Sequence, residues 1–172
     1  MPSRAVPRKV RDFILYYYAK LVIAPSAGEA KNYRFIMDRY RRLKAGELRI
    51  SDYDREIERA RAQRGLCAFC GARAPTVPAA IVPPSLGGPV GVHNLVHACR
   101  SCARSKDDKD LVRWWCDDLG RDKDDLPRVP IGLFLKLAYE RHVVSFTLER
   151  PCHDIREIWP ATGGHSRTLR AM

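Results

Sequence analysis

The stretch CAFCGARAPTVPAAIVPPSLGGPVGVHNLVHACRSCARSK, residues 67–106, carries most of the information about the fold of this chain. It contains two CxxC pairs, Cys67/Cys70 and Cys99/Cys102, and 28 residues separate them. A two-residue spacer lets both sulfurs of a pair face one centre, so two pairs can surround a tetrahedral Zn²⁺. Four protein ligands leave no open coordination position, which predicts a structural zinc. A redox dithiol is the alternative, although one CxxC pair is enough for that chemistry.

The residues around and between the cysteine pairs follow a second pattern. Its members, in chain order, are Ile81, Pro83, Ser85, Gly87, Gly88, Asn94, Leu95 and Lys106. Together with the four cysteines, over residues 65–110, this pattern resembles the zinc-bearing HNH endonucleases of the ββα-metal nuclease superfamily. The resemblance implies an α+β fold in which two short strands enclose a loop and a helix lies across them.

The resemblance also implies roles for four positions. Position 80 corresponds to the histidine that takes a proton from water, and position 79 to a carboxylate ligand of a divalent cation, usually Mg²⁺. Position 103 corresponds to a second cation ligand, an Asn or His on the helix. Asn94 corresponds to the residue that braces the histidine-bearing loop through backbone hydrogen bonds. The implied activity is hydrolysis of DNA phosphodiester bonds, in a bacterial or phage protein of defence or mobile-element biology.

Three of these positions hold alanine: Ala79, Ala80 and Ala103. A methyl group can neither bind a cation nor take a proton from water. The sequence therefore predicts a chain that keeps the scaffold of the enzyme and has no measurable phosphodiesterase activity. Alanine at the chemical positions of an otherwise intact motif favours deliberate inactivation. The alternative is a natural non-catalytic nucleic-acid-binding zinc protein derived from an HNH fold, and a zinc domain that binds other proteins is a weaker one.

Two nearby histidines could be proposed as substitutes for the missing groups. Strand alternation places His93 and His97 on one face, opposite Asn94. We interpret them as surface histidines, or as residues that support the zinc ligands, because a catalytic role requires them to reach the cation position.

The chain carries a net charge of +11 and has an isoelectric point near 9.7, which favours polyanionic partners such as double-stranded DNA. Residues 1–66 hold 16 Lys and Arg against 8 Asp and Glu, so the basic excess lies mainly in the first third. We expect the N-terminal helices to contact the DNA backbone and the zinc module to present its helix to a groove. The candidate DNA-binding residues are Arg39, Arg41, Arg42, Lys44, Arg100, Arg104 and Lys106. The resemblance also leaves room for a partner protein subunit that supplies targeting.

Helical periodicity predicts helices on both sides of the cysteine-bearing stretch. They cover residues 8–23, 29–45, 51–64 with Ser51 as N-cap, 107–119 and 131–145. We divide the chain into a basic helical region (1–64), a zinc-bound HNH module (65–119), and a C-terminal helix and tail (120–172). The linker before the last helix is expected to be exposed, and the tail from Pro151 has few packing signals. No run of about 18 apolar residues and no convincing secretion signal occurs, which predicts no membrane span and a cytoplasmic location.

Overall fold

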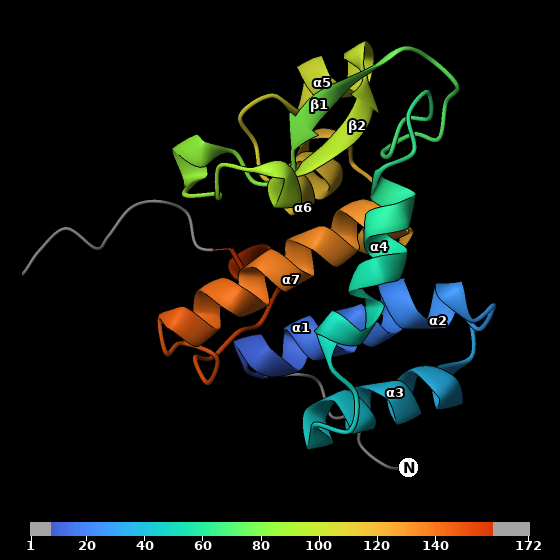
Figure 1. Cartoon of the computed structure of the whole chain (residues 1–172). Helices are drawn as coiled ribbons and strands as arrows, with labels where there is room; N and C mark the ends of the chain where they lie inside the picture. The colour runs from blue at the N-terminus through green and yellow to red at the C-terminus, as the bar shows by residue number, and fades with distance from the viewer. Residues whose placement is uncertain (1–7, 160–172) are drawn as a thin grey trace, which may run out of the picture.

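The structure is a computed structural model that describes residues 8–159. A long helical rod near the start of the chain and the last long helix lie side by side in it (Figure 1). In chain order the α-helices and strands are α1 (Val10–Tyr18), α2 (Ala24–Ser26), α3 (Tyr33–Ala45), α4 (Asp54–Arg61), β1 (Thr76–Ala80), β2 (Leu95–Cys99), α5 (Arg100–Lys106), α6 (Leu111–Arg113) and α7 (Arg128–Val144). The shorter helical segments are η1 (Ala19–Ile23), η2 (Ile50–Tyr53), η3 (Pro84–Leu86), η4 (Val92–Asn94), η5 (Trp114–Asp118), η6 (Lys123–Asp125) and η7 (Ile155–Glu157).

The rod consists of α1, the π-helical η1 and α2, and α7 packs against α1 and η1. Gly132 of α7 permits the close approach, because a Cβ there would lie 3.1 Å from Ile57 Cδ1 and 3.4 Å from Val22 Cγ2. α3 packs on the other side of the rod, and α4 packs against α7. Asn32 is the N-cap of α3, and its side chain accepts the Phe35 N–H. After Ala45 the helix is ended by Gly46, which adopts a φ of 78°.

The cysteine-bearing stretch forms two antiparallel strands followed directly by a helix, at the top of Figure 1. Thr76 lies opposite Cys99 and Ala80 opposite Leu95, and α5 packs against both strands. β2 buries Val96 and Ala98 while its alternate residues are more exposed, as the period of a strand requires. The α+β class that the sequence predicts is therefore confirmed.

One continuous apolar core joins the helices to this strand–helix unit. The Phe69 ring meets the Trp114 ring edge-on, with the ring centroids 5.0 Å apart. Among the described residues, no helix is both long enough and apolar enough to cross a membrane.

Two expected boundaries are wrong, and side-chain hydrogen bonds explain both. Ser51 is not an N-cap, because it lies inside η2 and the Asp52 carboxylate accepts the Arg49 N–H (2.8 Å) instead. Residues 107–110 are not helical, since Asp107 has a φ of 45° and Asp110 caps the next helix by accepting backbone N–H groups.

The linker and the tail, expected to be exposed or loosely packed, contribute to the core. Leu126 is buried, as are four residues of the tail: Cys152, Ile155, Ile158 and Trp159. His142 Nε2 lies 2.7 Å from the Ile158 carbonyl oxygen, which only accepts, so Nε2 carries the proton and holds the tail against α7. Burial lowers the pKa of His142 and favours this neutral form. Residues 160–172 of the tail lie outside the described residues.

Candidate functional site

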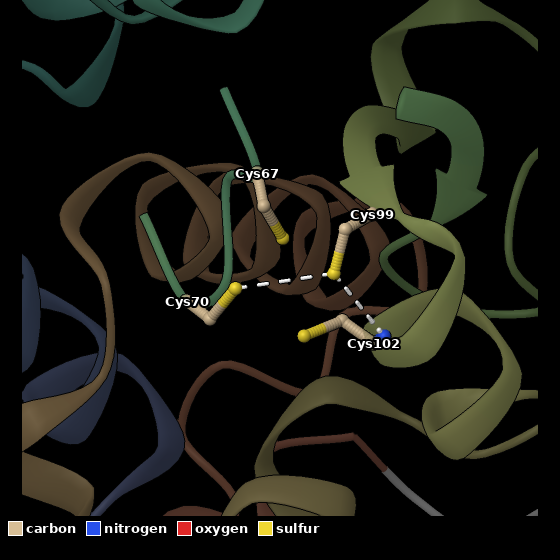
Figure 2. A group of neighbouring side chains, drawn as sticks. All are labelled: Cys67, Cys70, Cys99 and Cys102. Atoms are coloured by element: carbon tan, nitrogen blue, oxygen red, sulfur yellow. Dashed lines mark hydrogen bonds between the residues drawn. The ribbon is translucent and has the colours of Figure 1, made fainter. Parts of the chain in front are cut away.

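The four cysteine sulfurs converge on one point between the loop after α4 and the start of α5 (Figure 2). All four Sγ atoms lie within 4.8 Å of one another, and Cys70 Sγ is 3.9 Å from Cys99 Sγ. Ligands at the usual Zn–S distance of about 2.3 Å place neighbouring sulfurs about 3.8 Å apart. The cysteine cluster (Cys67, Cys70, Cys99 and Cys102) therefore has the ligand type and spacing of a tetrahedral metal site, and zinc fits it.

Short-range hydrogen bonds shape each half of the cysteine cluster. In the first half the Gly71 N–H donates to the Cys67 carbonyl (2.9 Å), and Gly71 takes a φ of 71° that favours glycine. The Ala68 N–H donates to the His97 carbonyl (2.8 Å), which ties this turn to β2. In the second half Cys99 is the N-cap of α5, and its sulfur accepts the Cys102 N–H (3.5 Å).

The protonation of the cluster thiols indicates how its charge would be balanced. Burial raises the pKa of Cys67, but backbone N–H groups of Cys70, Cys99 and Phe69 outweigh it and lower the pKa to about 7. Burial, and then the neighbouring thiols of Cys99 and Cys70, raise the pKa of Cys102. Four sulfurs this close cannot all become thiolates without a cation, and a bound Zn²⁺ supplies that charge.

The loop after β1 is built around the amide of Asn94. This side chain is 1% exposed; its Oδ1 accepts the Val82 N–H (2.9 Å), and its Nδ2 donates to the carbonyls of Val82 (2.6 Å) and Pro89 (2.9 Å). The Ile81 N–H also donates to the Asn94 carbonyl (2.8 Å). Asn94 thus fixes the backbone directly after Ala80, which is the bracing geometry expected from the sequence.

Glycine and two residues far along the chain complete the same loop. A Cβ on Gly88 would lie 1.9 Å from the Val82 carbonyl oxygen, so only glycine fits there. Trp159 Nε1 donates to the Leu86 carbonyl (2.9 Å), and Arg141 Nη1 donates to the Gly87 carbonyl (3.2 Å). The Arg141 guanidinium also lies 4.7 Å from the centroid of the Trp159 ring. Neither contact could be predicted from the sequence, because no local pattern links residues 84–88 to Arg141 of α7 or to Trp159 of the tail.

The three alanine positions (Ala79, Ala80 and Ala103) occupy neighbouring elements. Ala79 and Ala80 end β1 opposite Val96 and Leu95, and Ala103 lies on α5, which packs against β1. Ala79 and Ala103 are partly buried against the apolar core. Alanine offers no oxygen or nitrogen side-chain ligand, so these residues do not fit a Mg²⁺ ion.

Neither of the two histidines belongs to a group of three or more possible metal ligands among residues 8–159. Over residues 8–159, the cysteine cluster is the only group of three or more His, Cys, Asp or Glu side chains close enough to hold a metal. His93 lies in η4 and not on a strand, so the expected strand alternation applies to His97 alone.

The candidate DNA-binding residues of α3 are mostly engaged with other side chains. Arg42 lies 3.3 Å from the Glu47 carboxylate, and Lys44 lies 3.1 Å from the Asp12 carboxylate. The Arg39 guanidinium lies 4.6 Å from the Phe35 ring centroid. Arg41 is exposed, and no ion pair involves it among the described residues. α3 also lies at the opposite end of the molecule from α5 (Figure 1), so the two sets of basic residues are on helices that lie far apart.

On α5, two of the three candidates are exposed and one is not. Arg100 and Arg104 are exposed and flank Ala103 in the sequence, and within residues 8–159 neither is in an ion pair. Lys106 is 1% exposed, and its Nζ donates to the Lys109 carbonyl (2.7 Å). The expectation that Lys106 contacts DNA is therefore wrong: its side chain turns inward and binds the backbone that follows α5.

We expect Asn94→Ala to lower the free energy of unfolding by about 2–4 kcal/mol, because it leaves the buried N–H and carbonyl of Val82 without a partner and also removes the hydrogen bond to the Pro89 carbonyl. Urea unfolding followed by circular dichroism measures the change. His93→Ala, an exposed change one residue away, is the control and is expected to stay within about 0.5 kcal/mol. A loss below about 1 kcal/mol for Asn94→Ala would show that the loop does not depend on this amide.

Because Lys106 is buried, we expect the free energy of unfolding to increase as the pH rises above 8. Burial lowers its pKa from 10.5 to about 8, although Asp110, Asp108 and Asp107 act in the opposite direction. Above pH 8 the unfolded chain binds the proton more tightly than the folded one, so stability rises with pH up to the unfolded pKa. Between pH 8 and 9.5 the gain is about 2 kcal/mol, and Lys106→Met removes it. Lys109→Met, at an exposed lysine, is expected to keep it; equal pH profiles for the native chain and Lys106→Met would contradict this account.

Comparison with known proteins adds no relative: no protein-family model, no curated protein and no solved structure matches this chain.

Proposed function

We propose that this chain is an HNH-type DNA endonuclease scaffold whose catalytic groups are replaced by alanine, so that it binds DNA without cutting it. One observation carries the proposal: a strand–strand–helix unit holds a four-cysteine metal site at one end and places the three alanine positions on the adjoining β1 and α5. A zinc module that only binds nucleic acid does not require this arrangement of residues 79–103.

The loop between the strands supports the same proposal. Asn94 and Gly88 hold the backbone after Ala80 in a fixed conformation through buried hydrogen bonds and a close backbone approach. Rigid support of this kind suits a residue whose side chain must sit within hydrogen-bond reach of a reacting water. At position 80 the support remains although the side chain has no chemistry to perform.

The DNA surface is proposed to lie on α5, because Arg100 and Arg104 are exposed beside Ala103 and are not neutralised by ion pairs among residues 8–159. Arginines there would contact phosphates, which position a duplex without reading its sequence. The net charge of +11 supports such a polyanionic partner. The basic residues of α3 lie too far round the molecule to extend this surface directly (Figure 1).

Nicking of supercoiled plasmid tests the proposal. The unsubstituted chain is expected to leave the plasmid intact in Mg²⁺ or Mn²⁺, and the variant Ala79→Asp/Ala80→His/Ala103→Asn is expected to nick it. If the unsubstituted chain nicks DNA in a cation-dependent way, the proposal that this chain is catalytically inactive is wrong. If the restored variant folds and still fails to cut, the scaffold is not that of a nuclease.

A natural non-catalytic binding module is the second candidate, and the packing of the alanines favours it. Ala79 and Ala103 lie partly buried against the apolar core, where small apolar side chains are well placed without any catalytic past. Under this alternative DNA binding persists and the restored variant loses stability, because a carboxylate and an amide would then be forced against apolar neighbours. Thermal melting of the restored variant beside the nicking assay separates the two candidates.

A further inference from the structure

A second candidate site lies on the helical part of the molecule, away from the cysteine cluster and the three alanine positions. It is a cavity of about 870 Å³ between α1, the start of α3 and the segments around residues 123 and 154. Its floor is apolar and buried, formed in part by Phe13, Ile36 and Ile155. The volume is within the range of pockets that bind small organic ligands.

Aromatic rings form much of the wall of this cavity. Tyr17 stacks on Phe13 with the ring centroids 6.1 Å apart, and Tyr16 meets Tyr17 edge-on at 5.5 Å. Tyr33 also lines the cavity, and its side chain is 53% exposed. A flat ring entering the cavity would therefore find both an apolar floor and an exposed aromatic surface on which to stack.

Among the Lys, Arg, Asp and Glu side chains, three lysines and one aspartate line the cavity. Lys20 Nζ is 2.5 Å from Asp124, and the carboxylate of Asp154 is 3.1 Å from Arg156, so these charges are balanced. Lys31 and Lys123 also line the cavity, and in the part of the chain that the structure describes neither is in an ion pair. The cavity thus combines exposed aromatic surface with two available ammonium groups.

We propose that this cavity binds a nucleotide unit, with the base against Tyr33 and the phosphate at Lys31 and Lys123. Base–aromatic stacking and lysine–phosphate contacts use the two features that the cavity offers together. The unit can come from a free nucleotide or from the unpaired end of a DNA strand, which share this chemistry. The site is independent of the proposed nuclease scaffold, since none of its lining residues belongs to β1, β2 or α5.

Isothermal titration calorimetry of the full, zinc-loaded chain with ADP tests the site, with adenosine and pyrophosphate as the two half-ligands. We expect saturable binding of one ADP per chain, and at least tenfold weaker binding of either half-ligand, at about 1.4 kcal/mol per factor of ten. A 5′-phosphorylated deoxyadenosine tetranucleotide distinguishes the source: tighter binding than ADP identifies a strand end, and weaker binding a free nucleotide.

Variants of the cavity residues distinguish binding in this cavity from non-specific attraction of ADP to a basic protein. Tyr33→Ala is expected to weaken ADP binding roughly fivefold or more, and Lys31→Glu/Lys123→Glu about tenfold or more. Arg55→Glu/Arg59→Glu makes the same charge change on α4, outside the cavity, and is expected to change ADP affinity less than twofold. The proposal fails if neither ADP nor the tetranucleotide binds saturably, or if the control pair weakens binding as much as the lysine pair.

Discussion

Plasmid nicking is expected to rise from undetectable to readily measurable when Ala79→Asp, Ala80→His and Ala103→Asn are combined. Positions 79 and 103 would supply oxygen ligands for a hard divalent cation, and position 80 a base for the attacking water. The base alone accounts for about 10²–10⁴-fold in rate, and the cation stabilises charge on the scissile phosphate in addition. The rate should therefore depend on added Mg²⁺ or Mn²⁺ and disappear with EDTA.

Partial restorations make this result specific to the site. Ala80→His alone is expected to remain inactive, because it has no cation to stabilise the leaving group. Ala79→Asp/Ala103→Asn without the histidine should cut at least about a hundredfold more slowly than the triple variant. Adding Asn94→Ala to the triple variant should lower activity again, because the backbone after position 80 loses the hydrogen bonds that hold it in place. Equal rates for all four variants would point to a contaminating nuclease.

Removal of zinc has the largest expected effect on stability. The strand–helix unit buries few apolar side chains of its own, and the cysteine cluster joins the turn at Cys67 to the N-terminus of α5. The apparent binding free energy of a structural zinc, about 10–16 kcal/mol in small zinc domains near pH 7, greatly exceeds what this unit could recover from packing. We expect one zinc per chain by atomic emission, and loss of the β1–β2 amide protection when a chelator removes it.

Substitution of single cysteines provides the matched test of the zinc site. Cys67→Ser should abolish stoichiometric zinc and expose β1 and β2 to hydrogen exchange. Cys116→Ser, at a partly buried cysteine outside the cluster, should retain both. Purified protein that folds fully without any bound metal would contradict the assignment of the cysteine cluster as a structural centre.

The parts of the site that the sequence predicted are those fixed by short-range constraints. The CxxC spacing determines where each pair of sulfurs can point, and the structure confirms that the two pairs converge. Asn94 was predicted to hold the neighbouring loop, and its amide makes three hydrogen bonds there. In both cases the relevant contacts lie within the single stretch of residues 67–102.

The parts that the sequence did not predict depend on contacts between distant segments. Trp159 belongs to a tail with few packing signals, yet it holds the Leu86 carbonyl 73 residues away. Lys106 looked like one more basic residue of a DNA-binding helix, but Asp107, at a φ of 45°, ends the helix and Lys106 caps the turn that follows. A charge count also could not show that α3 and α5 lie at opposite ends of the molecule, because their arrangement is set by α1 and α7 between them (Figure 1).

Binding of Mn²⁺, followed by electron paramagnetic resonance, tests the central claim that positions 79 and 103 converge on one cation site. Ala79→Asp/Ala103→Asn is expected to bind one Mn²⁺ per chain, and tenfold or more tightly than either single variant, while the unsubstituted chain binds none at that concentration. Zinc content and the thermal melting curve of each protein confirm that the fold is intact. A correctly folded double variant that binds Mn²⁺ no better than the unsubstituted chain would show that positions 79 and 103 do not converge, and would contradict the account.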